Sequence, residues 1–596
     1  MSARRSYYFV HRWVGVVLGT ALVTVLFTGT VAVFADSLAE WASSSPRVSG
    51  LKELSLSGRL DTLIGESVAE HDPKRAGKLA VFEESNGDVR IALTRGPEAI
   101  GDPVVVDFVN ATGKVLETNS GRAPGVFAPK SPANSLKQFF VGLHVSFLIP
   151  GKLGVWLTGI TAMAMLMLAA SGVYVYWPSR KRMARPPRLK GARTLIGDLH
   201  TLLGAWTLPF TALAGATGVF FSFATSLLLP VLALVYFQGD IEAAVSSVAP
   251  RAHVTEQAQV ARLAEIFEDA EVRSGNEVRF VGIERSKDGG GLLVSVSTER
   301  HGWALTRELR LYDGHTGQFI QQAGVVGQVP SLGGTILSAM HGLHFGTTAG
   351  LATQILWFVL GLSACVLAGS GLSLWAVREE GKVNGQALRL LAHLSLALPL
   401  GFCVTVFVWA MGTHTGVHVN HGVLALGFFG ASFATAALAT RLPSGTAFRR
   451  VLWATAGALL LVPLAGVIAT GQAPWRNTTA VRVDLALLLF AAASAWLASR
   501  VPDFSRKLTS APSKPTSLRL SARMTLGVAG AFIGSIVVSL ATAVTMVELV
   551  PPGPAGVDHF LVALALFPVT WIAYALLIVF SMVTLSRRRT RILPAV

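Results

Sequence analysis

The sequence predicts a polytopic α-helical membrane protein of about ten transmembrane helices, with two small α+β domains and an internally repeated N-terminal part. Three observations carry this prediction. Charged residues make up 14% of the 596 residues, whereas soluble globular proteins carry about 25%. Several apolar runs reach the ~20 residues that a helix needs to cross a bilayer. Two long polar segments separate apolar runs that share the same motifs.

Ten apolar runs are expected to cross the membrane as helices. The third is long enough to tilt or to extend beyond the bilayer. The expected spans are residues 13–35, 153–177, 203–236, 350–376, 393–412, 421–440, 451–470, 481–499, 524–548 and 560–585. The chain accordingly divides into a first helix (1–36), a polar domain (37–136), helices 2 and 3 (137–236), a second polar domain (237–335), helix 4 (336–380) and a C-terminal six-helix region (381–596).

The net charge of +16 is better explained by membrane topology than by nucleic-acid binding. Basic residues gather before the first span, after the second, fourth, sixth and eighth spans, and after the tenth. All these loops fall on one side of a ten-span count, so both termini are expected in the cytoplasm and both polar segments outside. Cys365 and Cys403 lie inside apolar runs, which argues against a disulfide framework or a cysteine-based metal site.

The two polar segments are expected to form strands joined by turns. "VRIALTRG" and "VVVDFVNATGKVLE" belong to the first segment, and "LLVSVSTE" and "ELRLYDGHTGQFI" belong to the second. Their period-two alternation, with an Asp and a Thr-Gly turn, is typical of strand–turn–strand units.

The N-terminal part repeats one arrangement twice, over residues 1 to about 380. In each unit a helix led by histidine ("HRWVGVVLG", "LHTLLGAW") precedes the polar segment. A second histidine motif ("GLHVSFLIPGKLG", "GLHFGTTAG") follows it. The spans that come next also end alike, in "ASGVYVYWPSR" and "AGSGLSLWAVRE".

Four histidines occupy matching places in the two units. A single histidine at a membrane boundary often only reaches the interface or caps a bundle, but ionisable groups inside a membrane are by default candidates for function. His11 and His200 are expected near the cytoplasmic face, and His144 and His344 near the outer face. Partners within one unit would be separated by most of the ~30 Å hydrocarbon core. A pseudo-two-fold packing of the units would instead bring each pair together at one depth.

Two neutral imidazoles that face each other inside an apolar bundle are suited to a six-coordinate b-type haem. Two such sites would make an electron path across the membrane. Zinc fits less well, because it takes four ligands and no Asp, Glu or Cys accompanies these histidines. Nearby small residues suit a flat cofactor, although glycines are also common in ordinary helix packing in membranes. They are Gly15, Gly19, Gly142, Gly204, Gly342 and Gly346.

Five other histidines are weaker candidates. His341 lies three residues before His344 and is an alternative ligand for the outer site. His393, at the inner end of the fifth span, would be a third histidine placed at the start of a transmembrane helix. His414, His418 and His421 would share a helical face and bind a metal, a third haem or a substrate, or else form part of a solvated loop. The histidines of the polar domains, including His71, are expected at the surface.

The four histidine motifs, in this order, resemble those of the PepSY-associated transmembrane proteins, which are also described as iron-regulated membrane proteins. The strand–turn motifs of the polar segments resemble PepSY domains. The match is looser in the first segment, where Asp107 and Thr112 are two residues further apart than Asp313 and Thr316. The resemblance covers residues 1 to about 380 and leaves the C-terminal six spans unexplained.

The resemblance implies a bacterial inner-membrane protein similar to the FoxB-type ferric-siderophore reductases, which carry b haems. His11, His144, His200 and His344 would be the haem ligands. The activity would be one-electron reduction of Fe(III) held by a siderophore or another ferric chelate, with release of Fe(II) in the periplasm for iron uptake. No Gly-rich nucleotide fingerprint follows a strand, so the electron donor would be a quinol or a separate reductase.

Two other classes of function remain open. Ten spans with an internal repeat are typical of transporters, but transporter repeats usually place polar groups at mid-membrane. Here the repeated histidines lie at the ends of the spans, and Asp484 is the one possible buried carboxylate, near an outer end. A non-catalytic regulator whose outer domains bind another envelope protein is the third class. Neither alternative requires haem.

Overall fold

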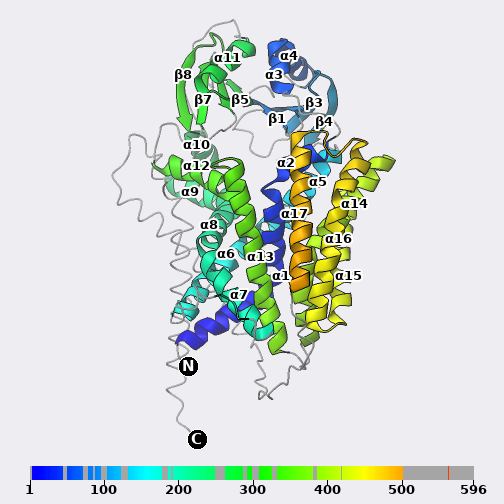
Figure 1. Ribbon diagram of the computed structural model, residues 1–596. Helices are drawn as coiled ribbons and strands as arrows, with labels where there is room; N and C mark the ends of the chain where they lie inside the picture. Colours follow the sequence, from blue (N-terminus) through cyan, green and yellow to red (C-terminus); the bar gives the residue numbers. More distant parts are fainter. Residues whose placement is uncertain are drawn as a thin grey trace.

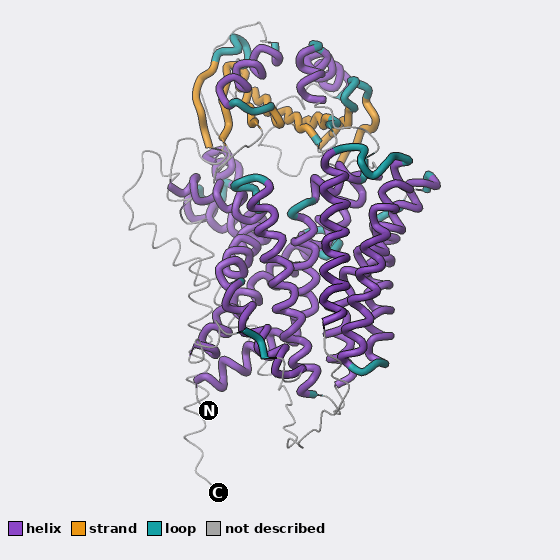
Figure 2. The backbone as a smooth tube through the Cα atoms, viewed as in Figure 1, coloured by secondary structure: helices purple, strands orange, loops and turns teal. Residues whose placement is uncertain are grey.

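The computed structural model describes residues 3–43, 50–71, 78–84, 87–94, 104–121, 132–177, 186–188, 192–248, 262–285, 291–298, 308–324, 332–379, 385–417, 419–500 and Val562. Their long helices form a bundle, and a β-sheet domain lies across one end of it (Figures 1 and 2). We call that end of the bundle the sheet end and the opposite end the far end.

Eight helical stretches among the described residues are long and apolar enough to cross a membrane, as a multi-pass membrane protein requires. They are α1 (Ala3–Ala32), α6 (Lys152–Tyr176), the run Leu208–Tyr236, α13 (Leu351–Arg378), α14 (Gly385–Thr415), α15 (His421–Thr440), α16 (Ser444–Thr470) and α17 (Thr478–Arg500). They coincide with the first eight expected spans, although α1 and α14 begin earlier. The expected spans 524–548 and 560–585 lie outside the described residues, apart from Val562.

The third expected span is broken into several helices. α7 (Ala192–Trp206) ends at Thr207, and α8 (Leu208–Phe223) carries Pro209 in its first turn. A π-helical turn (Ala224–Leu228) and α9 (Leu229–Tyr236), which has Pro230 in its first turn, complete the run. Proline lacks the N–H that a helix interior needs and fits best at a helix start. His200 therefore lies on α7, before the span itself.

Two shorter helices at the sheet end carry the other pair of histidines. They are α5 (Pro132–Ser146) and α12 (Leu332–Phe345), which precede α6 and α13. The turn after α12 uses Gly346 and Gly350, which have positive φ and no Cβ to strain. The turn after α5 places Phe147 and Leu148 at φ 52° and 60°, an unusual conformation for side chains of this size.

The two polar segments contribute four strands each, and all eight strands join in one sheet. The first segment supplies β1 (Lys78–Glu83), β2 (Val89–Thr94), β3 (Val104–Val109) and β4 (Val115–Gly121), and the second supplies β5 (Val278–Arg285), β6 (Leu292–Thr298), β7 (Glu308–Asp313) and β8 (Phe319–Gly324). The order is β4-β3-β2-β1-β5-β6-β7-β8, with β1 and β5 antiparallel and Val81 opposite Val281. This pairing covers two edges that separate four-stranded sheets would leave open.

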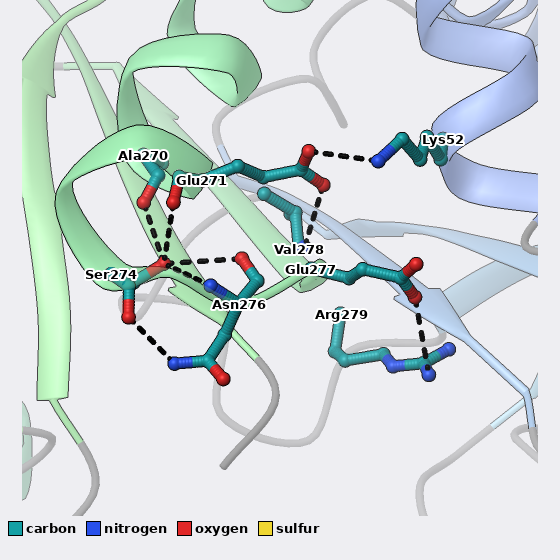
Figure 3. Close-up of polar contacts among 8 residues, drawn as sticks. All are labelled: Lys52, Ala270, Glu271, Ser274, Asn276, Glu277, Val278 and Arg279. Atoms are coloured by element: carbon teal, nitrogen blue, oxygen red, sulfur yellow. Dashed lines mark hydrogen bonds and ion pairs between the residues drawn. The ribbon is translucent and has the colours of Figure 1, made fainter. Parts of the chain in front are cut away.

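Helices cover the face of the sheet that points away from the bundle (Figure 1). They are α3 (Gly50–Leu56), α4 (Arg59–Glu70) and α11 (Leu263–Ser274), whose buried leucines, Ile266 and Phe267 form one core with both halves of the sheet. Lys52 of α3 and Glu271 of α11 form an ion pair of 3.0 Å across the two segments (Figure 3), and Glu271 raises the pKa of Lys52. Two further short helices, α2 (Ala35–Trp41) and α10 (Ile241–Val248), lie between sheet and bundle.

Candidate functional site

The structure brings four of the predicted site histidines together as two pairs. The ring centroids of His11 and His200 are 6.1 Å apart, with their planes at 81°. Those of His144 and His344 are 6.2 Å apart, with their planes at 34°. Each pair takes one residue from each repeat unit. His200 of the first pair belongs to α7, which lies toward the far end, and the second pair belongs to α5 and α12, which lie toward the sheet end (Figure 1).

The two pairs occupy separate sites. The ring of His144 packs against Gly29, and Gly29 lies on α1, the helix that also carries His11. Eighteen residues separate these two positions of α1, which corresponds to about 27 Å along a continuous helix. The pairs therefore lie near opposite faces of a hydrocarbon core about 30 Å thick.

Each of the four imidazoles makes its hydrogen bonds through Nδ1 within the described part of the chain. The partners come from a neighbouring helix of the same repeat unit. They are Ser171 Oγ for His11 (3.0 Å), the Val25 carbonyl for His144 (2.9 Å), the Leu367 carbonyl and Ser370 Oγ for His200 (both 3.0 Å), and Thr217 Oγ1 for His344 (2.8 Å).

These partners assign one tautomer to all four rings. A carbonyl can only accept, so Nδ1 of His144 and of His200 carries the proton. The hydroxyl of Ser171 donates to the Met167 carbonyl at 2.6 Å, and that of Thr217 donates to the Leu213 carbonyl at 2.8 Å. Their oxygens are then acceptors for Nδ1–H of His11 and His344. Every ring therefore keeps the lone pair of Nε2 for a ligand, as in metal-binding histidines oriented from behind.

A glycine lies against each of these rings. We describe each contact by the distance from a Cβ added at the glycine to Cε1 of the histidine. This distance is 2.7 Å for Gly29 and His144, 3.3 Å for Gly172 and His11, 3.1 Å for Gly371 and His200, and 4.0 Å for Gly218 and His344. Each glycine follows a serine or threonine, in Thr28-Gly29, Ser171-Gly172, Thr217-Gly218 and Ser370-Gly371. In three of these dipeptides the hydroxyl also bonds to the histidine. Thr28 is the exception, because its hydroxyl bonds to the Thr24 carbonyl.

Sequence reasoning did not find these dipeptides, although two of them stand in the similar span endings "ASGVYVYW" and "AGSGLSLW". The glycines that were expected to admit a cofactor mostly pack elsewhere. A Cβ at Gly19 would meet Leu372 at 2.9 Å, and one at Gly346 would meet Trp357 at 2.9 Å. They serve the close approach of helices that is common in membranes.

The paired rings fit a metal centre with two axial imidazoles. With metal–nitrogen bonds of about 2 Å, two imidazoles on opposite sides of one ion have ring centroids about 6 Å apart. The observed separations of 6.1 and 6.2 Å agree with this value. The described residues contain no group of three or more His, Cys, Asp or Glu that could hold a metal ion. The donor set therefore suits a haem, whose macrocycle supplies the other four ligands, and the roles of the four histidines as haem ligands stay a prediction.

None of the weaker candidates replaces a member of the two pairs, although His341 lies beside His344, and Phe221 contacts both of their rings. His341 stacks on Phe345 at 4.4 Å, whereas His344 faces His144. His393 is 8% exposed and lies inside α14. His414 is exposed in the last turn of the same helix. His421 begins α15 with its ring 6.3 Å from Phe139, and His418 lies outside the described residues.

His71 departs from its expected position, whereas Asp484 is the buried carboxylate that the sequence indicated. His71 was expected at the surface, but its side chain is only 16% exposed, and Nε2 lies 3.3 Å from the buried carboxylate of Asp107. Asp484 is 7% exposed and accepts a hydrogen bond of 2.9 Å from the Trp41 indole. This bond fastens α17 to α2, so Asp484 acts as a structural contact between the repeats and the C-terminal helices.

Comparisons with known proteins agree with this arrangement. The model of the PepSY-associated TM region matches residues 8–378, a range that contains both histidine pairs. An uncharacterized protein of Pseudomonas aeruginosa is 28% identical over 409 residues, which cover 62% of this chain and 94% of that relative. The helices from α14 onward lie beyond the family match.

Proposed function

We propose that this chain, which belongs to the PepSY-associated transmembrane family, is a di-haem b reductase of a bacterial inner membrane. In this proposal single electrons cross the membrane to a ferric chelate such as a ferric siderophore. The chelated Fe(III) becomes Fe(II), which is released in the periplasm for iron uptake. The observation that carries the proposal is the pair of opposed histidine sites, each with centroids about 6 Å apart and Nε2 left available.

In the proposed mechanism, His11 and His200 hold one haem at the far end, and His144 and His344 hold the other at the sheet end. A haem supplies an iron that accepts and gives up one electron at a time. The Nδ1 hydrogen bonds orient the four rings so that Nε2 of each would be left for the iron, and the glycines make room beside the rings.

The sheet end is the periplasmic side in this proposal, and the far end is cytoplasmic. A cavity extends between the bundle and the sheet, where a chelate would have room. Its charged lining there includes Arg90, Arg279, Arg310, Glu83 and Glu84. Arg279 is held by Glu83 at 2.6 Å, and Arg90 lies over the Phe82 ring at 4.7 Å. Fixed charges of both signs suit a polar chelate. The donor in this proposal is a quinol or a separate reductase.

Optical spectra of the purified protein test the proposal. The oxidised and dithionite-reduced forms, with a pyridine haemochrome count, are expected to give a sharp reduced α band and about two haems b per chain. His11→Ala and His344→Ala are each expected to remove one haem and leave the other. His414→Ala is the matched control, because His414 is exposed in the last turn of α14, beyond the helices that carry the two pairs.

Two results would count against the proposal. If the protein carries no haem after expression with ample haem supply, a transporter or a regulatory protein becomes the better assignment. If either alanine variant keeps its full haem content, the corresponding ligand assignment is wrong.

A further inference from the structure

The cavity continues from the sheet into the bundle, as a cleft between the repeat units and the C-terminal helices. The whole cavity measures about 2540 Å³. Within the bundle its walls come from one face of α13 and from α14, α16 and α17. Three of the apolar residues that line it, Val359, Val366 and Leu489, are 53%, 53% and 70% exposed. The cleft is therefore open at the level where membrane lipid surrounds the bundle.

The far end of this apolar cleft is polar. His393, Ser395, Ser370, Ser373 and Arg389 line it there. His393 is 8% exposed, and its buried Nδ1 has no hydrogen-bond partner within the described part of the chain. A buried imidazole without a partner in a cleft indicates a ligand that supplies one.

The polar groups at this end offer both acceptors and donors. The hydroxyls of Ser370, Ser373 and Ser395 donate to carbonyls of their own helices, at 2.7, 2.8 and 3.1 Å. Their oxygens, and one nitrogen of neutral His393, remain able to accept. Arg389 donates to the Leu442 carbonyl at 2.7 Å through one terminal nitrogen, and its buried Nε has no partner in the described part of the chain. A ligand whose hydroxyl groups both donate and accept can satisfy this mixed set, whereas a lipid phosphate can only accept.

The cleft also reaches the far-end histidine pair. Ser370 lines the cleft and bonds to Nδ1 of His200 at 3.0 Å. The adjacent Gly369 faces Ser395 on α14, because a Cβ added there would lie 3.7 Å from the Ser395 side chain. His393 is two residues from Ser395 on the same helix. The side chain of Ser370 therefore connects the polar end of the cleft to His200, a proposed haem ligand.

We propose that this cleft binds a membrane quinol, with a ring hydroxyl donating to His393 and the isoprenoid tail along the apolar walls. The proposal rests on the proposed function, for which it identifies the electron donor. Oxidation of one quinol to quinone breaks two O–H bonds and releases two protons and two electrons. His393 would accept the first proton and water at the far end the second, and two bound haems would each supply an acceptor for one of the two electrons.

Binding of decylubiquinol to the purified full-length protein, measured anaerobically by calorimetry, tests this site. His393→Leu is expected to weaken binding about tenfold, the usual effect of losing one hydrogen bond. Val366→Trp, which fills the cleft one turn from Ser370, is expected to abolish saturable binding. The matched controls are His414→Leu on α14 and Leu356→Trp on α13. Leu356 is 49% exposed and does not line the cleft.

The same titration on His200→Ala separates the two proposals, because quinol binding does not require the far-end haem. Saturable binding of decylubiquinol to a protein that carries no haem would support the proposed quinol site and count against the proposed reductase activity. A protein with two haems that binds no quinol would overturn the cleft alone. Equal affinity in wild type, His393→Leu and Val366→Trp would overturn it too, as would a phospholipid that stays in the cleft and that quinol does not displace.

Discussion

At the scale of single residues, the two members of the sheet-end pair are held differently. His344 donates to the hydroxyl oxygen of Thr217, whereas His144 donates to the Val25 carbonyl. The corresponding threonine of the first repeat, Thr28, uses its hydroxyl within its own helix. The repeats thus contain a natural control, because both have the Thr-Gly dipeptide but only the second has a hydrogen bond between its threonine and the ring.

Thr217→Val is expected to weaken the sheet-end haem, because the variant removes the acceptor that orients His344. Loss of such an outer partner typically costs 10- to 100-fold in metal affinity. The rate of haem transfer to an apo-globin acceptor measures this. Thr28→Val is expected to leave that rate unchanged. Equal rates for both variants would show that the Thr217 hydrogen bond does not support the ligand.

Gly29→Ala is expected to remove the sheet-end haem and spare the other. A Cβ at Gly29 would lie 2.7 Å from Cε1 of His144, so the ring has to move out of line with its partner. The haemochrome count is then expected to fall from about two to about one per chain. Gly15→Ala on the same helix is the control, since its Cβ would make an ordinary contact of 3.6 Å with Leu168. Two full haems in Gly29→Ala would contradict the observed packing.

The sequence revealed the four histidines but not the residues behind them. Histidine is rare in apolar runs, so His11, His144, His200 and His344 were recognisable from position and repetition alone. Their partners are contacts between helices, and Ser-Gly or Thr-Gly carries no local signal for such a contact. His71 was misjudged for the same reason, because its partner Asp107 lies 36 residues away.

At the scale of elements, the start of the turn in the first segment was assigned three residues too early. Asn110 rather than Asp107 is the counterpart of Asp313. The N–H of each closes its turn, to Lys114 O at 3.0 Å and to Gln318 O at 2.9 Å. The side chain of each accepts backbone N–H groups inside the turn. Asp107 instead lies inside β3, where Ser67, His71 and Thr118 surround it.

Asp107→Asn is expected to destabilise the sheet domain by about 2–3 kcal/mol, because an amide NH₂ would face donors in a buried site. Asp313→Asn is expected to cost less than about 1 kcal/mol, since Asn110 already performs that role in the other half. The loss of stability in each variant is measured by thermal unfolding of the full chain in detergent, with limited proteolysis of the sheet segments as the readout. Equal losses in the two variants would contradict the distinction between Asp107 and Asp313.

The helices and strands themselves were largely predictable, because apolar length and period-two alternation are local properties. All four quoted strand motifs form strands. The break between α7 and α8 was missed, since proline in a long apolar run can either kink a helix or start one. Pro399 and Pro463 lie inside helices of this same chain, so proline alone did not locate the break.

At the scale of the whole molecule, the two repeats combine at three levels. Each histidine pair, at either end of the bundle, contains one residue from each repeat. In the sheet, β1 of the first repeat pairs with β5 of the second. The sequence predicted the pairing of histidines at equal depth, because span direction determines depth. It did not predict the joined sheet, because nothing in a strand's own pattern states which edge it will pair with. The C-terminal helices then add a wall to the cleft beside the far-end pair.

This arrangement predicts a direction of electron flow that single-ligand variants can separate. With decylubiquinol as donor, both haems of the wild-type protein are expected to become reduced. In His200→Ala the sheet-end haem should still be reduced by dithionite, but its reduction by quinol should slow at least tenfold. The reason is that the variant empties the site next to the cleft, and about 27 Å of helix separates the two pairs. His344→Ala should show the opposite pattern, with a far-end haem that quinol reduces and a ferric chelate that is no longer reduced. Stopped-flow spectra of the two variants distinguish these outcomes, and wild-type reduction by quinol in His200→Ala would place the donor at the sheet end instead.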